Sequence, residues 1–239
     1  VLEFQVSYTG PKQVAPELGL GRLQVGVPFE APRTTVSGGR PNVLLIVIDT
    51  LRADRLGCYG AEKPLTPVMD GLAEGGTRFS AAYSAAPWTL PGTASILTGK
   101  SPPEHGIGTS DSFYLPDALD TLGEICQRQG LTTAAFTCNP LIAAGRNFDQ
   151  GFESFKNYRW PSSSVILDDV VGWLRDNGEQ RFFLYLHPTD PHYPYEPTDE
   201  SAARFVGEAP EGFFAGELRP ETGRHYFDPE FDTQLLVDS

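Results

Sequence analysis

The stretch Val43-Leu44-Leu45-Ile46-Val47-Ile48-Asp49 is the clearest strand signal in the chain. Its first six residues are all apolar, as expected of a parallel strand that helices cover on both faces. Asp49 ends the run, and functional sites of open α/β sheets form at the carboxyl ends of such strands. Asp49 is therefore a candidate metal-binding carboxylate, with an Asp that only makes the turn after the strand as the alternative.

Strand and helix patterns alternate along the rest of the chain. Apolar runs of strand length predict three further strands, over residues 77–82, 132–137 and 182–186. Helices are predicted from Thr66-Pro67 to Gly75, from Leu119 to Gly130 and from Ser164 to Gly178. This alternation predicts an α/β fold with a mostly parallel central sheet flanked by helices.

A second informative stretch, Pro87-Trp88-Thr89-Leu90-Pro91-Gly92, leads into a short predicted helix, Thr93 to Leu97, that stops at Gly99. Pro91 suits the first helical position because its missing N–H would have no partner inside the helix. Thr89 then lies at or just before a helix N-terminus, where free N–H groups and the helix dipole favour an anion. A hydroxyl there can attack a phosphorus or sulfur centre; the alternative is a hydroxyl that only caps the helix.

Composition narrows the range of partners. The chain has 239 residues, 40% of them apolar and 21% charged, which is typical of a globular protein. It carries 18 basic and 31 acidic residues, a net charge of −13. This balance argues against nucleic acid or an anionic membrane as partner, since both need basic patches. No apolar run reaches the length of a membrane span, so none is predicted.

The segment from Thr89 to Gly99 resembles the nucleophile motif of the sulfatase and alkaline-phosphatase-like superfamily. The matching residues are Thr89, Pro91, Gly92, Thr93, Thr98 and Gly99. The resemblance implies an alkaline-phosphatase-like fold with Thr89 as nucleophile. Sulfatases proper begin the motif with Cys or Ser, which is converted to formylglycine, and carry Arg where Thr93 stands. A Thr nucleophile is similar to the phosphodiesterase and phosphoglycerol- or phosphoethanolamine-transferase branches. No formylglycine is therefore expected, and phosphate esters are favoured over sulfate esters.

Two further segments carry the resemblance. Asp49-Thr50-Leu51-Arg52-Ala53-Asp54 looks like the family's opening metal motif, which implies that Asp49 binds a divalent ion: Zn, Mn, Mg or Ca. The family often has a second Asp where Thr50 stands, so a site with one metal is expected. The segment from Lys100 to Gly106 resembles a family loop. It makes Lys100 and His105 candidate substrate contacts, with a loop-structuring His105 as the alternative.

The segment His187-Pro188-Thr189-Asp190-Pro191-His192-Tyr193-Pro194-Tyr195 is similar to a third family motif. The resemblance implies that His192 approaches the transferred group or the leaving oxygen, to which it can donate a proton. His187 and Asp190 are expected to hold the loop, and the alternative places both histidines on the surface. Family members also place substrate contacts near Asn139, which makes it a candidate substrate-binding residue. The alternative is that Asn139 only forms the turn before Pro140.

The resemblance covers about residues 41–195, roughly the first half of a typical member. Residues 1–40 are predicted to be an N-terminal extension and linker, with short strands over 1–6 and 19–27. Residues 196–239 are an acidic segment rich in Pro and Gly, in which His225 and Asp228 are expected on the surface. The family's later Asp-His-Gly or Asp-Asn-Gly metal motif is not in this sequence. Half of the metal site is therefore missing from the printed chain.

The start of the chain and its three cysteines give expectations about the cellular location of the protein and about disulfide bonds. The chain begins at Val1 and its only methionine is Met69, which suggests a processed or partial polypeptide. An extracytoplasmic location, periplasmic or secreted, is expected, with a tether upstream of Val1 as an option. Cys58, Cys126 and Cys138 have no metal-like spacing and allow at most one disulfide.

Two functions stay open from the sequence. The first is a metal-dependent hydrolase or transferase for small phosphate or sulfate esters, acting through Thr89. The second is an inactive sulfatase-like subunit of a larger extracytoplasmic assembly. Missing strands would leave an open sheet edge, so this second function predicts a protein partner that covers that edge.

Overall fold

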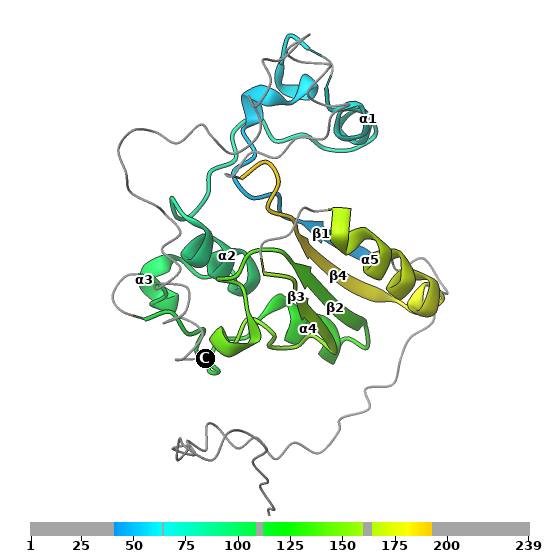
Figure 1. Ribbon diagram of the computed structural model, residues 1–239. Helices are drawn as coiled ribbons and strands as arrows, with labels where there is room; N and C mark the ends of the chain where they lie inside the picture. The colour runs from blue at the N-terminus through cyan, green and yellow to red at the C-terminus, as the bar shows by residue number, and fades with distance from the viewer. Residues whose placement is uncertain (1–40, 64, 109–111, 160–163, 193–239) are drawn as a thin grey trace, which may run out of the picture. The chain divides into compact units, whose positions relative to one another are not determined.

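Figure 1 shows the computed structural model, which describes residues 41–63, 65–108, 112–159 and 164–192. The predicted extension over 1–40, with its two short strands, lies outside these residues. So does the acidic segment over 196–239 with His225 and Asp228.

The described residues build one sheet of four parallel strands. The strands are β1 (Val43–Ile46), β2 (Thr132–Thr137), β3 (Ser154–Asn157) and β4 (Phe182–His187), in the order β1-β4-β2-β3. Ile46 lies opposite Leu186, and Thr137 lies opposite His187, so the carboxyl ends of β1, β2 and β4 meet at one edge. This arrangement confirms the predicted α/β fold with a parallel central sheet.

One predicted strand is wrong. Residues 77–82 form no regular structure, and β3 supplies the fourth strand instead. The Phe79 side chain is 68% exposed, and the Phe79 carbonyl accepts a hydrogen bond from the Tyr59 hydroxyl rather than from a neighbouring strand. A strand needs a partner for its backbone groups, and this short run of Phe, Ser and Ala found none among the described residues.

The helices flank the sheet (Figure 1). They are α1 (Pro67–Gly75), α2 (Thr89–Thr98), α3 (Pro102–His105), α4 (Leu122–Arg128) and α5 (Ser164–Asn177), with 3-10 turns η1 (Ala53–Arg55), η2 (Gly57–Tyr59) and η3 (Ala144–Arg146). Helix α4 begins later than predicted because Thr121 and Glu124 form a capping box, in which each side chain accepts the other's backbone N–H. None of the described helices has the length and apolar character needed to cross a membrane.

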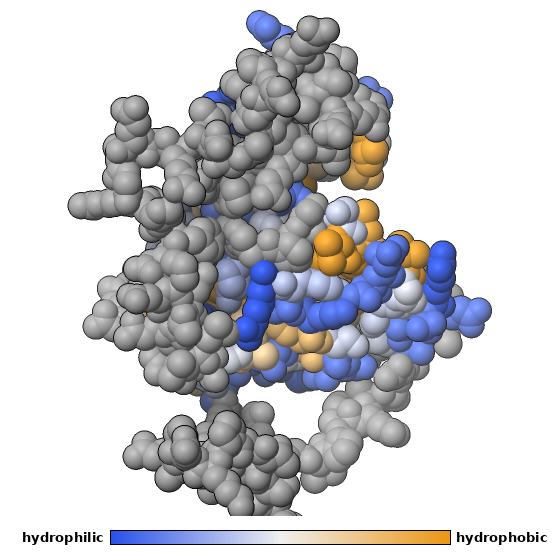
Figure 2. Space-filling model, in the orientation of Figure 1, coloured by the Kyte–Doolittle hydropathy of each residue, from blue (hydrophilic) through white to orange (hydrophobic). Residues whose placement is uncertain are grey.

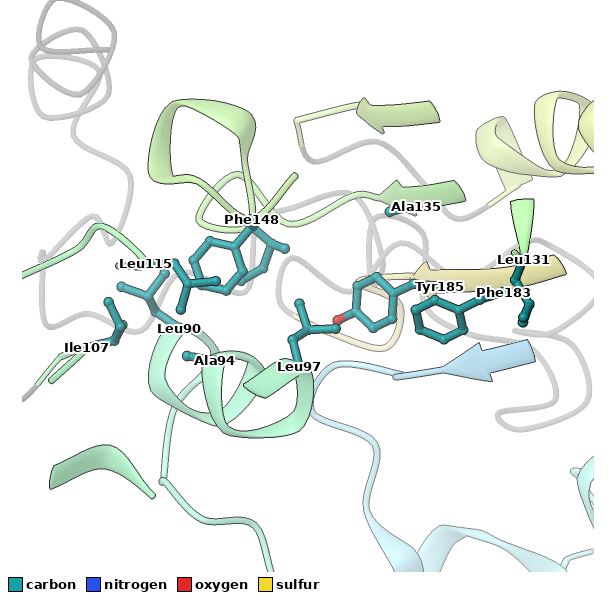
Figure 3. Close-up of a cluster of buried hydrophobic side chains, with 11 residues drawn as sticks. Leu90, Ala94, Leu97, Ile107, Leu115, Leu131, Ala135, Phe148, Phe183 and Tyr185 are labelled. Atoms are coloured by element: carbon teal, nitrogen blue, oxygen red, sulfur yellow. The ribbon is translucent and has the colours of Figure 1, made fainter. Parts of the chain in front are cut away.

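Different helices bury the two faces of the sheet. Alternate residues of a strand point to opposite faces. The first face joins β2 and β4 to α2 through Ala135, Phe183, Tyr185, Leu90, Ala94 and Leu97 (Figure 3). The second joins the same strands to α5 through Ala134, Phe136, Leu184 and Val170. Each fully buried Leu contributes about 1.5–3 kcal/mol, so the first cluster fixes α2, and with it Thr89, on the sheet.

The three cysteines form no disulfide with one another in this structure. Cys58, Cys126 and Cys138 are all free thiols, so the disulfide that the sequence left open is not formed. Burial raises the pKa of the Cys138 thiol to about 11, and it also raises the pKa of Cys126. Both thiols therefore stay protonated at neutral pH and act as small apolar side chains.

Leu97→Ala tests the attachment of α2. Leu97 is 1% exposed, so we expect the substitution to lower the free energy of unfolding by about 2–5 kcal/mol. The neighbouring Ile96 is 40% exposed, and Ile96→Ala is the matched control, with an expected loss of about 1 kcal/mol or less. Urea denaturation measures both variants. Equal losses would show that α2 is not held by this cluster.

Candidate active site

The carboxylate of Asp49 is the point at which three segments of the chain meet. The backbone continues the β1 ladder past its last strand residue, because the Asp49 N–H donates to the Pro188 carbonyl at 3.1 Å. The Oδ2 atom accepts hydrogen bonds from Thr89 Oγ1 at 3.1 Å and from Asn139 Nδ2 at 2.8 Å. His187 Nε2 lies 3.6 Å from the same oxygen. The structure thus brings together three predicted site residues, Asp49, Thr89 and Asn139.

The Asp49 carboxylate is held in its ionised form. Burial by itself raises its pKa, but the neighbouring His187 ring, together with hydrogen bonds from Asn139 and Thr89, outweighs burial. The net result is a pKa below the usual range of an aspartate. The side chain is only 11% exposed, so this negative charge sits in a largely protein-lined position.

Thr89 lies at the N-terminus of α2, as predicted, but the helix begins at Thr89 itself and not at the predicted Thr93. Trp88 is the N-cap of α2, Thr89 is the first helical residue, and the first backbone bond runs from Gly92 N to Trp88 O at 3.2 Å. Pro91 is accommodated because the N–H groups of the first turn have no partner inside a helix. Trp88 makes no side-chain cap, and the Thr89 hydroxyl donates to Asp49 instead. Its hydroxyl therefore faces a carboxylate at a helix N-terminus, where an anion is favoured.

Asn139 both forms a turn and supports the site. Its Oδ1 accepts the Leu141 N–H at 2.9 Å, while its Nδ2 donates to Asp49. The residue is 2% exposed, and both ends of its amide are used within the protein. This geometry favours a role in orienting Asp49, and direct contact with a substrate stays a prediction.

His105 is built into the protein beside α2, and Lys100 lies away from Thr89. His105 is 2% exposed, and its Nδ1 accepts the Ile107 N–H while its Nε2 contacts Ser95 Oγ, both at 3.0 Å. Burial lowers its pKa, so the ring is a neutral link between α2 and α3, which favours the loop-structuring alternative. Lys100 follows the far end of the ten-residue α2, about 15 Å from Thr89, and pairs with Glu104 at 3.9 Å.

His192 and Asp190 lie in the turn after β4. The His192 N–H donates to the Thr189 carbonyl at 2.5 Å, and the residue is half-buried. This turn follows the carboxyl end of β4, the same edge of the sheet that carries Asp49. The action of His192 on a leaving oxygen stays a prediction.

The residues at Asp49 fit part of a metal site. An ionised carboxylate and a hydroxyl are oxygen ligands of the kind that hard divalent ions accept, but such ions take six or more. Among the described residues, no group of three or more His, Cys, Asp or Glu side chains is placed to hold a metal. Asp49 and Thr89 would therefore contribute to a metal site whose other ligands are water or residues outside the described ranges.

Thr50 occupies a strained position beside the candidate ligand. Its φ of 55° lies in the left-handed region, where a β-branched residue is an outlier and Asp or Asn is tolerated. The backbone thus suits the Asp that the family often carries here better than it suits Thr.

Thr50→Asn is expected to raise the free energy of unfolding by about 1 kcal/mol, because Asn enters the left-handed region at lower cost. The matched control is Thr50→Val, which keeps the β-branch and the strain. Thermal and urea unfolding compare the two at this exposed position. An Asn variant no more stable than the Val variant would contradict the strain.

Comparison with known proteins gives consistent results. The family model described as Sulfatase matches residues 41–213. The N-acetylglucosamine-6-O-sulfatase of Bacteroides thetaiotaomicron is 26% identical over 211 residues, which cover 80% of this chain and 36% of that protein. A solved structure in complex with its substrate D-glucosamine-2-N,6-O-disulfate has a TM-score of 0.61 at 24% identity, covering 77% of this chain and 39% of that one.

The phosphonate monoester hydrolase of Agrobacterium radiobacter has a TM-score of 0.52 at 20% identity, covering 66% of this chain and 43% of that one. The alkaline-phosphatase-like fold is thereby confirmed. The chain spans less than half the length of each of these three proteins, between 36% and 43%.

Proposed function

The chain belongs to the sulfatase family, and on this premise we propose that it carries the nucleophile of a metal-dependent hydrolase or transferase for phosphate esters. One observation carries the proposal: the Thr89 hydroxyl, at the start of α2, donates to the ionised Asp49 carboxylate at 3.1 Å. A nucleophilic hydroxyl, an acidic partner and an anion-binding helix end then lie within one hydrogen bond of each other. An extracytoplasmic location stays a prediction from the sequence.

The reaction begins with attack by Thr89. Its Oγ1 gives up its proton to the Asp49 carboxylate, to which it already donates, and forms a bond to phosphorus in line with the leaving oxygen, while the phosphorus–oxygen bond to that group breaks. The free N–H groups at the start of α2 stabilise the non-bridging oxygens, and His192 donates a proton to the leaving alcohol. Water, or an acceptor alcohol in a transferase, then releases the group from phosphothreonine. A divalent ion held by Asp49 would lower the pKa of the Thr89 hydroxyl and polarise the ester.

Two residues favour phosphate over sulfate esters. Position 89 is Thr, and formylglycine is made only from Cys or Ser. Thr93, where sulfatases proper carry Arg, is 2% exposed and bonds to Tyr185, so it adds no positive charge for a sulfate group. The likeness to a phosphonate monoester hydrolase is consistent with a phosphorus centre, and the sulfatase relative keeps sulfate esters as the second substrate class.

Thr89→Ala tests the nucleophile. We expect the rate of phosphate-ester hydrolysis by the native protein to fall by more than about 10³-fold, because no other group at this position can form the covalent intermediate. Thr89→Ser keeps a hydroxyl at this position and should retain part of the activity. Thr77→Ala, an exposed Thr in the segment before α2, is the matched control. Release of 4-nitrophenol from its phosphate mono- and diesters measures all four proteins, and full activity of Thr89→Ala would overturn the proposal.

Asp49→Asn tests the metal. The substitution keeps the shape of the side chain but removes its charge, so we expect affinity for Mn²⁺ or Zn²⁺ to fall by at least about tenfold. Asp54→Asn, an exposed Asp that pairs with Arg52 at 2.7 Å, is the matched control. Titration calorimetry on the metal-free native protein measures both. Equal metal affinity of Asp49→Asn and wild type would exclude Asp49 as a ligand.

One observation favours the second function, an inactive subunit in a larger assembly. Among the described residues, β1 pairs only with β4, and its Val43, Leu44 and Ile46 side chains are 43%, 52% and 49% exposed. Figure 2 shows apolar surface in the region of β1 and α5. An exposed apolar edge strand is normally covered or paired. A native protein that takes up no divalent ion and purifies with a second protein on β1 would favour this function over the enzyme.

A further inference from the structure

The ring of His187 is buried between a hydroxyl and the Asp49 carboxylate. His187 is 1% exposed, and its Nδ1 lies 2.8 Å from the Tyr185 hydroxyl. Its Nε2 lies 3.6 Å from Asp49 Oδ2, and it is buried without a hydrogen-bond partner in the described part of the chain. A buried N–H without a partner is costly, and the carboxylate is the acceptor toward which it is directed. The ring therefore belongs to the Asp49 environment and not only to the loop after β4.

The hydroxyl behind His187 fixes the direction of the hydrogen bonds. Tyr185 is fully buried, and burial raises the pKa of its hydroxyl, which therefore stays protonated. The Thr93 side chain contributes a hydrogen bond to this hydroxyl. Because Tyr185 stays protonated and Nε2 is directed at the negatively charged Asp49 oxygen, the arrangement that satisfies both groups has the Tyr185 O–H donating to His187 Nδ1 and the ring proton on Nε2. That N–H faces Asp49.

These contacts close into a ring across three elements. Thr93 and Thr89 are four residues apart on α2, so their side chains lie on the same face of the helix one turn apart. One path runs from Thr93 through Tyr185 and His187 to Asp49, and the other runs from Thr89 directly to Asp49. Helix α2 is thus linked to the carboxylate twice, once directly and once through β4.

The donors gather on one carboxylate oxygen. Thr89, Asn139 and His187 all face Oδ2, whereas Oδ1 has a longer contact of 3.5 Å with Thr89 Oγ1. A carboxylate anchored through one oxygen presents the other in a fixed direction. This arrangement leaves Oδ1 as the oxygen best placed to bind a cation.

We propose that His187 is a positioning residue for the reaction at Thr89: it fixes the Asp49 carboxylate so that Oδ2 holds the Thr89 hydroxyl and Oδ1 faces the metal. This inference rests on the proposed function for its consequences in catalysis. The claim that His187 controls the Asp49–Thr89 contact can be tested by protein unfolding, which needs neither enzymatic activity nor a bound metal.

Two substitutions separate the ends of the ring. His187→Gln keeps a donor at the reach of Nε2, so it can still contact Asp49. His187→Asn keeps a polar group near Tyr185 but is too short to contact Asp49. We expect His187→Asn to weaken Mn²⁺ binding and to lower kcat by about 10- to 100-fold with little change in KM, and His187→Gln to recover most of both.

The decisive readout is the coupling between Thr89 and Asp49. A double-mutant cycle of Thr89→Ala and Asp49→Asn, followed by urea unfolding of the native protein, measures this coupling. We expect it to be present in wild type and in His187→Gln and to be lost in His187→Asn. Thr133→Val is the control for destabilisation alone: it removes a buried hydroxyl of β2 that contacts Glu153 N, and it should leave the coupling unchanged.

The outcomes separate this inference from the proposed function. Coupling lost in His187→Asn and kept in His187→Gln supports the inference even where no ester is hydrolysed. Unchanged coupling in His187→Asn overturns it, even where the native protein is an active enzyme. Where His187→Asn does not fold, Tyr185→Phe replaces it, because it removes the hydroxyl that orients the ring while keeping the aromatic packing; unchanged coupling there overturns the inference too.

Discussion

A single buried negative charge organises the described part of this chain. The Asp49 carboxylate accepts hydrogen bonds from Thr89 and Asn139, and its backbone extends the β1 ladder. The cost of burying this charge is offset by these donors and by His187, which together keep its pKa low. The donors come from different elements: Thr89 from α2, Asn139 from the residues after β2, and His187 from β4. The charge is therefore stabilised only when these elements are correctly packed together. The requirements of the fold and of the chemistry therefore coincide at one atom, Oδ2.

The apolar core supplies the precision that this charge needs. Leu90, Ala94 and Leu97 place one face of α2 in the same buried cluster as Phe183 and Tyr185, and in Figure 3 Leu97 lies toward Tyr185 while Leu90 lies toward Leu115 and Phe148. That packing sets the height of the helix N-terminus above the sheet edge, and so the distance from Thr89 to Asp49. The left-handed Thr50 that follows Asp49 indicates that backbone strain is tolerated at this edge. Such strain is found where the surrounding structure fixes a functional group.

The sequence predicts Asp49, Thr89 and Asn139 as candidate site residues one by one: Asp49 and Asn139 follow predicted strands, and Thr89 stands at a predicted helix start. It does not predict the hydrogen bonds that join them. It also does not predict β3, whose Ser154–Asn157 sequence is short and polar at three of its four positions, and it predicts a strand at 77–82 instead. The role of His187 was also missed, although a signal was present. Tyr185 and His187 are two residues apart on a strand and therefore share a face, and the same spacing argument pairs Thr89 with Thr93 on a helix. Local spacing shows which residues share a face of a strand or helix. It does not show which residues those faces contact, because that depends on tertiary packing.

The account stands on Thr89 as the residue that receives the transferred group. The direct measurement is acid quenching of the native protein during turnover of a phosphate diester, followed by peptide mass spectrometry of the segment that contains α2. We expect one phosphoryl group on Thr89 that still carries the remaining ester group of the diester, and we expect this adduct to be absent from Asp49→Asn. Turnover with an unmodified Thr89, or a phosphoryl group on another residue, would contradict it.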